Sequence, residues 1–311
     1  MLRSNKDFKK IILIAGPTAS GKSKIAIALA KKINGEIINT DSMQVYKEIS
    51  VLSARPKNKD LKIIKHHLYG FLSVKKNFSV GQWLKFVKKK ISDIISQGKV
   101  PILVGGTGLY FNAITKGLSK IPIIQERKRG QIRSLYKKIG RDKFYKKLLS
   151  IDPKCKNKIL PFDTQRILRA YEVKKFTNKS LYDWVRNTKS EFNKYTLIKI
   201  YLDMPREKLL KRIYFRTTKL LNKNCFSEVK NFNKLKIKSS LSVNKIIGIK
   251  EIKDYLAGNL TLSETEDLIN IRTRQYAKRQ STWARGHMKN WNKLYNDDFP
   301  ILFKKILKLA S

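Results

Sequence analysis

The chain has 311 residues, of which 41% are hydrophobic, so it can form one large domain or two smaller ones with an apolar core. It carries 69 lysines and arginines against 23 acidic residues, and this net charge of +46 favours a polyanionic partner. There is no apolar run near the ~20 residues of a membrane span, no signal-peptide pattern and no zinc-binding spacing of cysteine and histidine. We therefore expect a cytoplasmic protein without membrane contact, acting as a monomer.

The first predicted elements are a buried strand at residues 10–15, a glycine-rich loop, and a helix at residues 23–33. The loop consists of Gly16, Pro17, Thr18, Ala19, Ser20, Gly21, Lys22 and Ser23. This pattern is typical of loops whose backbone N–H groups surround phosphates, while the lysine neutralises charge and the serine reaches Mg²⁺. A helix that begins at such a loop also attracts anions. The sequence thus predicts a polyphosphate site with Mg²⁺ bound through Ser23.

Strand and helix patterns alternate up to about residue 120. Strands are predicted at residues 36–42 and 100–105, and helices at 83–96 and 109–114. This alternation predicts a parallel sheet covered on both faces. Ligands of such sheets bind at the carboxyl ends of the strands, where the glycine loop, Asp41 and Thr107 are expected.

The pattern changes to helices alone between about residues 123 and 190, with helices predicted at 126–139, 142–149 and 164–176. A strand at 195–202, a basic helix from 206, a polar loop at 230–240 and a helical tail follow. In that tail, Tyr276 is expected on one helix face and Arg279 on another. We predict an α/β core in residues 1–122, a helical insertion in 123–190, and the resumed core with C-terminal helices in 191–311.

Arginines gather in three segments of a chain whose basic residues are mostly lysine. They are Arg166 with Arg169, Arg212 with Arg216, and the segment 272–279. Because a planar guanidinium suits two-pronged contacts to phosphate or bases, these segments are candidates for chemistry or RNA contact. The last segment contains Arg272, Arg274, Lys278 and Arg279, and a salt-bridged surface helix explains it equally well.

Several motifs, in a fixed order from residue 11 to about 285, resemble those of the bacterial tRNA dimethylallyltransferases. Besides the glycine loop, they are Asn39-Thr40-Asp41-Ser42 with Gln44-Val45-Tyr46, Ala54-Arg55-Pro56, His66-His67-Leu68, Val104-Gly105-Gly106-Thr107-Gly108-Leu109-Tyr110, Gln165-Arg166 with Arg169-Ala170 and Glu172, and the segment 273–280 with Trp283. The resemblance implies a P-loop NTPase-like parallel-sheet core with an all-helical insertion. It also implies transfer of a dimethylallyl group from dimethylallyl diphosphate to N6 of adenosine 37, in tRNAs that read codons beginning with U.

The resemblance gives roles to three residues. Asp41 is the candidate general base, because an adenine amine is a poor nucleophile and must lose a proton as it reacts. A helix cap or a Mg²⁺ partner is the alternative role. Thr107 is expected to hold the adenine or the bridging oxygen, or else to be a turn residue among glycines. Arg216, with Arg212 as the alternative, is expected to stabilise the leaving diphosphate.

The expected partner is the anticodon stem-loop of tRNA, from which adenosine 37 must be pulled out of its stack. The contact residues that the resemblance implies are Asp41, Ser42, Met43, Gln44, Arg129, Gln165, Arg166, Ile167, Leu168 and Arg169. Arg272, Arg274, Lys278 and Arg279 are expected to join them at the phosphates.

Three other functions compete with this interpretation. An adenylate isopentenyltransferase acting on free AMP, ADP or ATP would not need the helical insertion or the arginine segments. A small-molecule kinase would explain the glycine loop, but not the segment 104–110. A non-catalytic RNA-binding protein would have no use for an intact Lys22, Ser23, Asp41 and Thr107.

Overall fold

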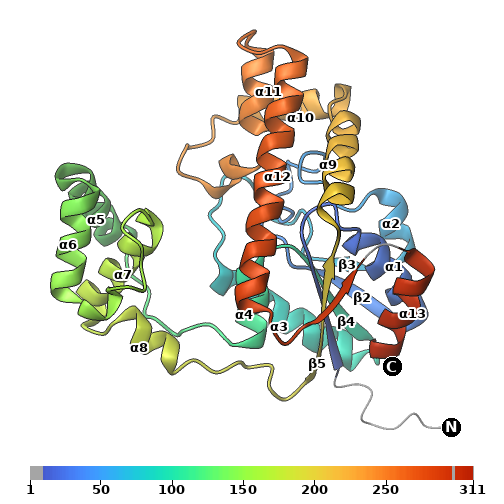
Figure 1. Ribbon diagram of the computed structural model, residues 1–311, viewed down its shortest axis with the longest axis horizontal. Helices are drawn as coiled ribbons and strands as arrows, with labels where there is room; N and C mark the ends of the chain where they lie inside the picture. Colours follow the sequence, from blue (N-terminus) through green and yellow to red (C-terminus); the bar gives the residue numbers. More distant parts are fainter. Residues whose placement is uncertain (1–9, 296–297, 311) are drawn as a thin grey trace. The chain divides into compact units, whose positions relative to one another are not determined.

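The computed structural model in Figure 1 describes residues 10–295 and 298–310. The chain divides into two compact units. One is formed by the residues up to Thr115 together with those from Phe192 onward, and the other by Lys116–Glu191. The second unit is therefore inserted into the sequence of the first.

The first unit is built on a parallel sheet, as the alternating pattern predicted. Within the described residues the strands are β1 (Lys10–Ala15), β2 (Gly35–Asn39), β3 (His66–His67), β4 (Val100–Gly105), β5 (Thr196–Asp203) and β6 (Asn292–Tyr295). They lie in the order β3-β2-β4-β1-β5-β6, and every neighbouring pair is parallel. The carboxyl ends of β1, β2 and β4 therefore lie side by side at one edge of the sheet.

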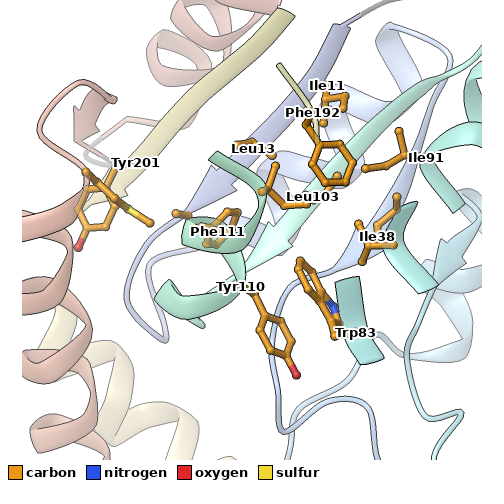
Figure 2. Packing of buried hydrophobic residues seen from close by; sticks show 14 of the residues in the cluster. Ile11, Leu13, Ile38, Trp83, Ile91, Leu103, Tyr110, Phe111, Phe192 and Tyr201 are labelled. Carbon is orange, nitrogen blue, oxygen red and sulfur yellow. The ribbon is translucent and has the colours of Figure 1, made fainter. Parts of the chain in front are cut away.

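Helices cover both faces of this sheet. On one face α3 (Val80–Ser96) and α4 (Gly108–Thr115) pack against Ile11, Leu13 and neighbouring apolar residues, which Figure 2 shows from close by. On the other face α1 (Lys22–Lys32) and α13 (Phe299–Ala310) pack against Ile12 and Ile14. Because successive residues of a strand point to opposite faces, a strand covered on both sides is apolar on both, as β1 is from Ile11 to Ala15.

Further helices extend the first unit beyond the sheet. They are α2 (Asn58–Ile63), α9 (Arg206–Leu220), α10 (Lys223–Lys234), α11 (Ile249–Leu256) and α12 (Leu262–His287). The loop predicted at residues 230–240 is wrong in its first half, where α10 continues to Lys234. That helix is stabilised by burial of Val229 and Phe232, three residues apart, in an apolar cluster that also includes Leu52. In Figure 1, α12 is the long helix beside α9, and the two are in contact.

The second unit consists of helices and their connections. The helices are α5 (Glu126–Ile139), α6 (Arg141–Ile151), α7 (Thr164–Thr177) and α8 (Leu181–Arg186). Its own apolar core contains Phe144, Leu148 and Ile167, all fully buried. This unit is the all-helical insertion expected from the sequence pattern.

Across both units, no helix in the described part of the chain has the length and apolar character required to cross a bilayer.

Candidate active site

The glycine loop turns between β1 and α1 at the carboxyl end of the sheet. Gly21 has a φ of 89°, a left-handed conformation that glycine adopts without strain, and it directly precedes the first turn of α1. A Cβ on Gly16 would collide with the carbonyl oxygen of Leu202 on β5. The Lys22 ammonium donates a hydrogen bond to the carbonyl oxygen of Pro17 at 2.6 Å. The loop is thus closed on itself around its lysine.

A cavity of about 500 Å³ opens beside this loop. Its walls come from the glycine loop, from the ends of β2 and β4, and from α9 and α12. The polar residues that line it include Lys22, Ser23, Asp41, Gln44, Arg212, Arg216, Tyr276, Arg279 and Gln280. Residues more than 250 positions apart in the sequence therefore line one space.

Asp41, Lys22 and Arg216 form a charged group in this cavity. Burial raises the pKa of the Asp41 carboxyl, and the backbone N–H of Met43 at 2.9 Å and the two cations partly oppose that rise. Burial lowers the pKa of Lys22 to about 8, against the attraction of Asp41. Arg216 donates to the Thr18 hydroxyl at 3.2 Å, which connects α9 with the glycine loop. The structure thus places a carboxylate of raised pKa beside two cations that can bind a polyphosphate.

A second cavity, of about 280 Å³, lies next to the first and shares Met43, Tyr276, Arg279 and Gln280 with it. Thr107 lines this second cavity and not the first. Its hydroxyl oxygen accepts a hydrogen bond from the Ser42 backbone N–H at 3.0 Å and donates to the Ser42 hydroxyl at 3.3 Å. Thr107 therefore stabilises the chain directly after Asp41.

Gln280 of α12 joins the two sides of the site. Its side-chain carbonyl accepts from the Thr18 backbone N–H at 2.8 Å, and its amide donates to the Gly106 carbonyl oxygen at 3.0 Å. A Cβ on Gly106 would collide with Gln280, and one on Gly108 would collide with the Trp283 ring. The glycines after β4 are thus required because α12 packs directly against that loop.

The predicted tRNA-contact residues fall into both units. In the first unit, Ser42, Met43 and Gln44 line the cavities together with Asp41. In the second unit, Gln165 and Arg166 are exposed in the first turn of α7, where Asp163 accepts a hydrogen bond from the Arg166 backbone N–H.

Arg129 and Arg169 of the second unit flank the buried carboxylate of Glu172, at 3.7 and 3.8 Å from it. Leu168 packs at the edge of the apolar core of this unit. Ile167 differs from the prediction, because its side chain is fully buried in that core. It therefore supports α7 from inside, and its side chain is not available to a partner.

The basic residues at 272–279 of α12 separate into three groups. Arg272 forms an ion pair of 2.5 Å with the buried Glu251 of α11, which agrees with the surface-brace interpretation for this residue. Arg274 and Lys278 are exposed. Arg279 lines both cavities, with its guanidinium 5.9 Å from the centre of the Tyr276 ring. The expectation that Tyr276 and Arg279 lie on different faces is wrong, because residues three apart on a helix are neighbours.

Sequence reasoning missed Tyr69 and the site roles of Tyr276, Gln280 and Trp283. The available signal was their spacing, since 276, 280 and 283 recur at the interval of one helix face. Tyr69 follows the short strand β3 and lines the first cavity, where burial raises the pKa of its hydroxyl.

The fold and the site together define a protein of the P-loop class with a cavity for a phosphorylated ligand. Residues 44–287 match the model of the IPP transferase family, and the chain belongs to this family. This confirms the resemblance read from the motifs.

Relatives and solved structures agree with that family. The chain is 57% identical to a tRNA dimethylallyltransferase of Pelagibacter ubique over 92% of its own length and 91% of the relative's. It is 44% identical to the enzyme of Rickettsia massiliae over 91% and 78%. A tRNA isopentenylpyrophosphate transferase from Bacillus halodurans is similar in structure, with a TM-score of 0.69, 33% identity and coverage of 96% and 95%. A eukaryotic dimethylallyltransferase acting on tRNA gives a TM-score of 0.79, with 28% identity and coverage of 92% and 74%.

Proposed function

We propose that this chain transfers the dimethylallyl group from dimethylallyl diphosphate to N6 of adenosine 37 in tRNA, with release of diphosphate. The observation that carries the proposal is that a carboxylate, Asp41, shares one cavity with the cations Lys22 and Arg216. The tRNA dimethylallyltransferases at 57% and 44% identity support the same reaction and acceptor. Because tRNA is the acceptor, we expect the enzyme to work in the cytoplasm.

The reaction forms a bond between N6 and the first carbon of the prenyl group and breaks the bond from that carbon to the bridging oxygen. The electron pair of the broken bond leaves with the diphosphate, and the N6 proton passes to Asp41. A positioned base of this kind contributes roughly 10²–10⁴-fold. Its raised pKa makes Asp41 a stronger base than an exposed aspartate.

The leaving diphosphate receives its stabilisation from the glycine loop. Lys22, the N–H groups at the start of α1, and Arg216 face the cavity in which the negative charge develops. Ser42 and Thr107 line the adjoining cavity, which we assign to the acceptor nucleoside. The residues shared by the two cavities then lie where donor and acceptor meet.

The cavity also suits Mg²⁺. The Ser23 residue lines it, and a Mg²⁺ ion needs few protein ligands when the oxygens of a phosphorylated substrate supply the others. No group of three histidine, cysteine or acidic residues in the described ranges could hold a metal by itself. Mg²⁺ bound through Ser23 would neutralise charge on the diphosphate. Arg216, Lys22 and the loop orient that diphosphate.

The test of the proposed function is transfer of label from dimethylallyl diphosphate in the presence of Mg²⁺. One sample holds an unmodified tRNA with adenosines at positions 36 to 38, and the other holds AMP and ATP. Label in the tRNA alone is the expected result. Label on the free nucleotide would reassign the chain to adenylate prenylation, and no transfer to either acceptor would refute the proposal.

A second test addresses the RNA surface. Arg166 lies exposed on α7, with its side chain 66% accessible and 3.3 Å from Asp163. We expect Arg166→Ala to weaken tRNA binding. The slope of log Kd against log salt should fall by about 1, the value for one lost phosphate contact. An unchanged slope would show that Arg166 contacts no phosphate.

A further inference from the structure

A single carboxylate holds a loop of the substrate cavity from outside. Glu228 on α10 accepts four hydrogen bonds from residues 50–52. One oxygen accepts from the Ser50 backbone N–H at 2.6 Å, from the Ser50 hydroxyl at 2.9 Å and from the Val51 N–H at 2.8 Å, and the other accepts from the Leu52 N–H at 3.0 Å. Hydrogen bonds to a charged acceptor are the stronger kind, so this loop is anchored firmly.

The anchor itself is fixed by packing. Val229, the next residue of α10, is fully buried in the same apolar cluster as Leu52. A Cβ on Gly248 would come within 2.6 Å of the Leu52 side chain, so Leu52 occupies the space that this glycine leaves. Leu52, together with Ser53 and Ala54, lines the cavity that contains Asp41. Glu228 thus connects a packed helix to a wall of the active site.

The next two residues of the loop fix a side chain that faces the substrates. The amide nitrogen of Gln44 donates to the carbonyl oxygen of Ser53 at 2.9 Å and to that of Ala54 at 3.0 Å. Both amide hydrogens are then used, and the amide cannot turn over without placing an oxygen against two oxygens. Among the described residues, none donates to the Gln44 side-chain oxygen. Gln44 lines the cavity, so this oxygen is its remaining polar atom for a ligand.

Backbone strain marks the same loop. Ala54 has a φ of 49°, in the left-handed region that is unfavourable for a non-glycine residue. Its N–H donates to the Val51 carbonyl at 2.9 Å, and the Ser53 hydroxyl donates to the Ile49 carbonyl at 2.6 Å. A strained conformation persists only where its surroundings determine it, and it is common at functional sites.

We propose that Glu228 is a positioning residue of the active site, and that it acts through the 50–54 loop on Gln44. The fixed Gln44 oxygen accepts a hydrogen bond from the exocyclic amine of the acceptor adenine. That amine carries two hydrogens, of which Asp41 takes one during transfer and Gln44 holds the other. The inference rests on the proposed function, since it names a contact to the same acceptor.

The test is a double-mutant cycle on kcat/KM for tRNA, with Gln44→Leu, Glu228→Gln and the double variant. We expect each single variant to lose about 10-fold, the effect of one hydrogen bond of about 1.4 kcal/mol. Because Glu228 acts through Gln44, the double variant should lose about 10-fold as well, and KM for dimethylallyl diphosphate should stay within about twofold. A loss near 100-fold in the double variant would overturn the inference, because a merely structural role adds to the loss at Gln44.

Two controls complete the design. Glu207→Gln changes an exposed glutamate in the first turn of α9 and should leave activity and thermal midpoint unchanged. Gln44→Glu tests the orientation without touching α10, because its carboxylate would face the Ser53 and Ala54 carbonyls. We expect Gln44→Glu to lose as much kcat/KM as Gln44→Leu. This variant can be measured even if Glu228→Gln fails to fold. Activity near that of the unaltered enzyme would overturn the inference. If the unaltered enzyme transfers no prenyl group to tRNA, the proposed function itself is wrong.

Discussion

Replacing Asp41 by asparagine separates its chemistry from its structural contacts. The Asp41 carboxylate accepts a hydrogen bond from the Met43 N–H at 2.9 Å, and an asparagine oxygen can accept the same bond. The turn at the end of β2 is therefore retained while the base is lost. Loss of a positioned base lowers kcat by roughly 10²–10⁴-fold, which corresponds to about 2.7–5.4 kcal/mol of transition-state free energy.

The same substitution weakens catalysis but makes the surroundings of the donor more positive. Lys22 and Arg216 lose the negative neighbour that partly neutralises them in the cavity. Their attraction for diphosphate should then increase, so that KM for dimethylallyl diphosphate falls or stays the same. A base defect thus has a distinct signature, in which kcat falls strongly without any weakening of donor binding.

The assay is single-turnover transfer of labelled prenyl group to tRNA, with tRNA affinity measured separately by filter binding. Asp41→Asn should bind tRNA as the unaltered enzyme does, and its turnover should fall at least ~10²-fold. Normal single-turnover chemistry combined with lost tRNA binding would refute the assignment. So would a rise in KM for the donor that accounts for the whole defect.

Three further predictions concern pH, an ion pair and a helix glycine. The kcat/KM profile should be bell-shaped. Its acid limb should lie above the ordinary aspartate range, where Asp41 takes up a proton, and its alkaline limb near pH 8, where Lys22 loses its charge. A flat profile up to pH 9 would contradict this. Arg272→Ala leaves Glu251 buried without its cation and should destabilise the fold by about 1–3 kcal/mol, with an unchanged salt slope of tRNA binding; an unchanged thermal midpoint would contradict the brace. Gly130 lies within α5, and a Cβ added there would have open space around it. Gly130→Ala should therefore raise the free energy of unfolding by roughly 0.5–1 kcal/mol, measured by thermal melting. A lower thermal midpoint would reveal a role for this glycine.

The sequence pattern was sufficient for the long elements of the fold. The strands at 10–15 and 100–105 and the helix at 126–139 have the predicted bounds, because each is apolar on both faces or regularly periodic. The edge strands β3 and β6 were missed. With two and four residues they are too short for a pattern, and they form because β2 and β5 offer unpaired backbone groups at the edges of the sheet.

The site could be predicted only in part, for a different reason. The glycine loop is a local motif, and the end of β2 placed Asp41 at the correct edge of the sheet. Arg216 lies almost 200 residues after Lys22, and no local pattern brings them together. The family motifs supplied that connection. Neither pattern nor motif revealed the hydrogen bonds of Gln280, since side-chain contacts between distant segments depend on the final packing of α12.

The grouping of charges in the first cavity explains why donor binding should raise the proton affinity of Asp41. Without ligand, Lys22 and Arg216 both lower the pKa of Asp41, which burial alone would raise further. A bound diphosphate engages the same two cations and adds negative charge beside the carboxylate. Both effects raise the proton affinity of Asp41, so the base becomes stronger when the donor is in place. One set of three side chains therefore both binds the leaving group and adjusts the base, and this couples proton removal from the amine to the presence of a donor.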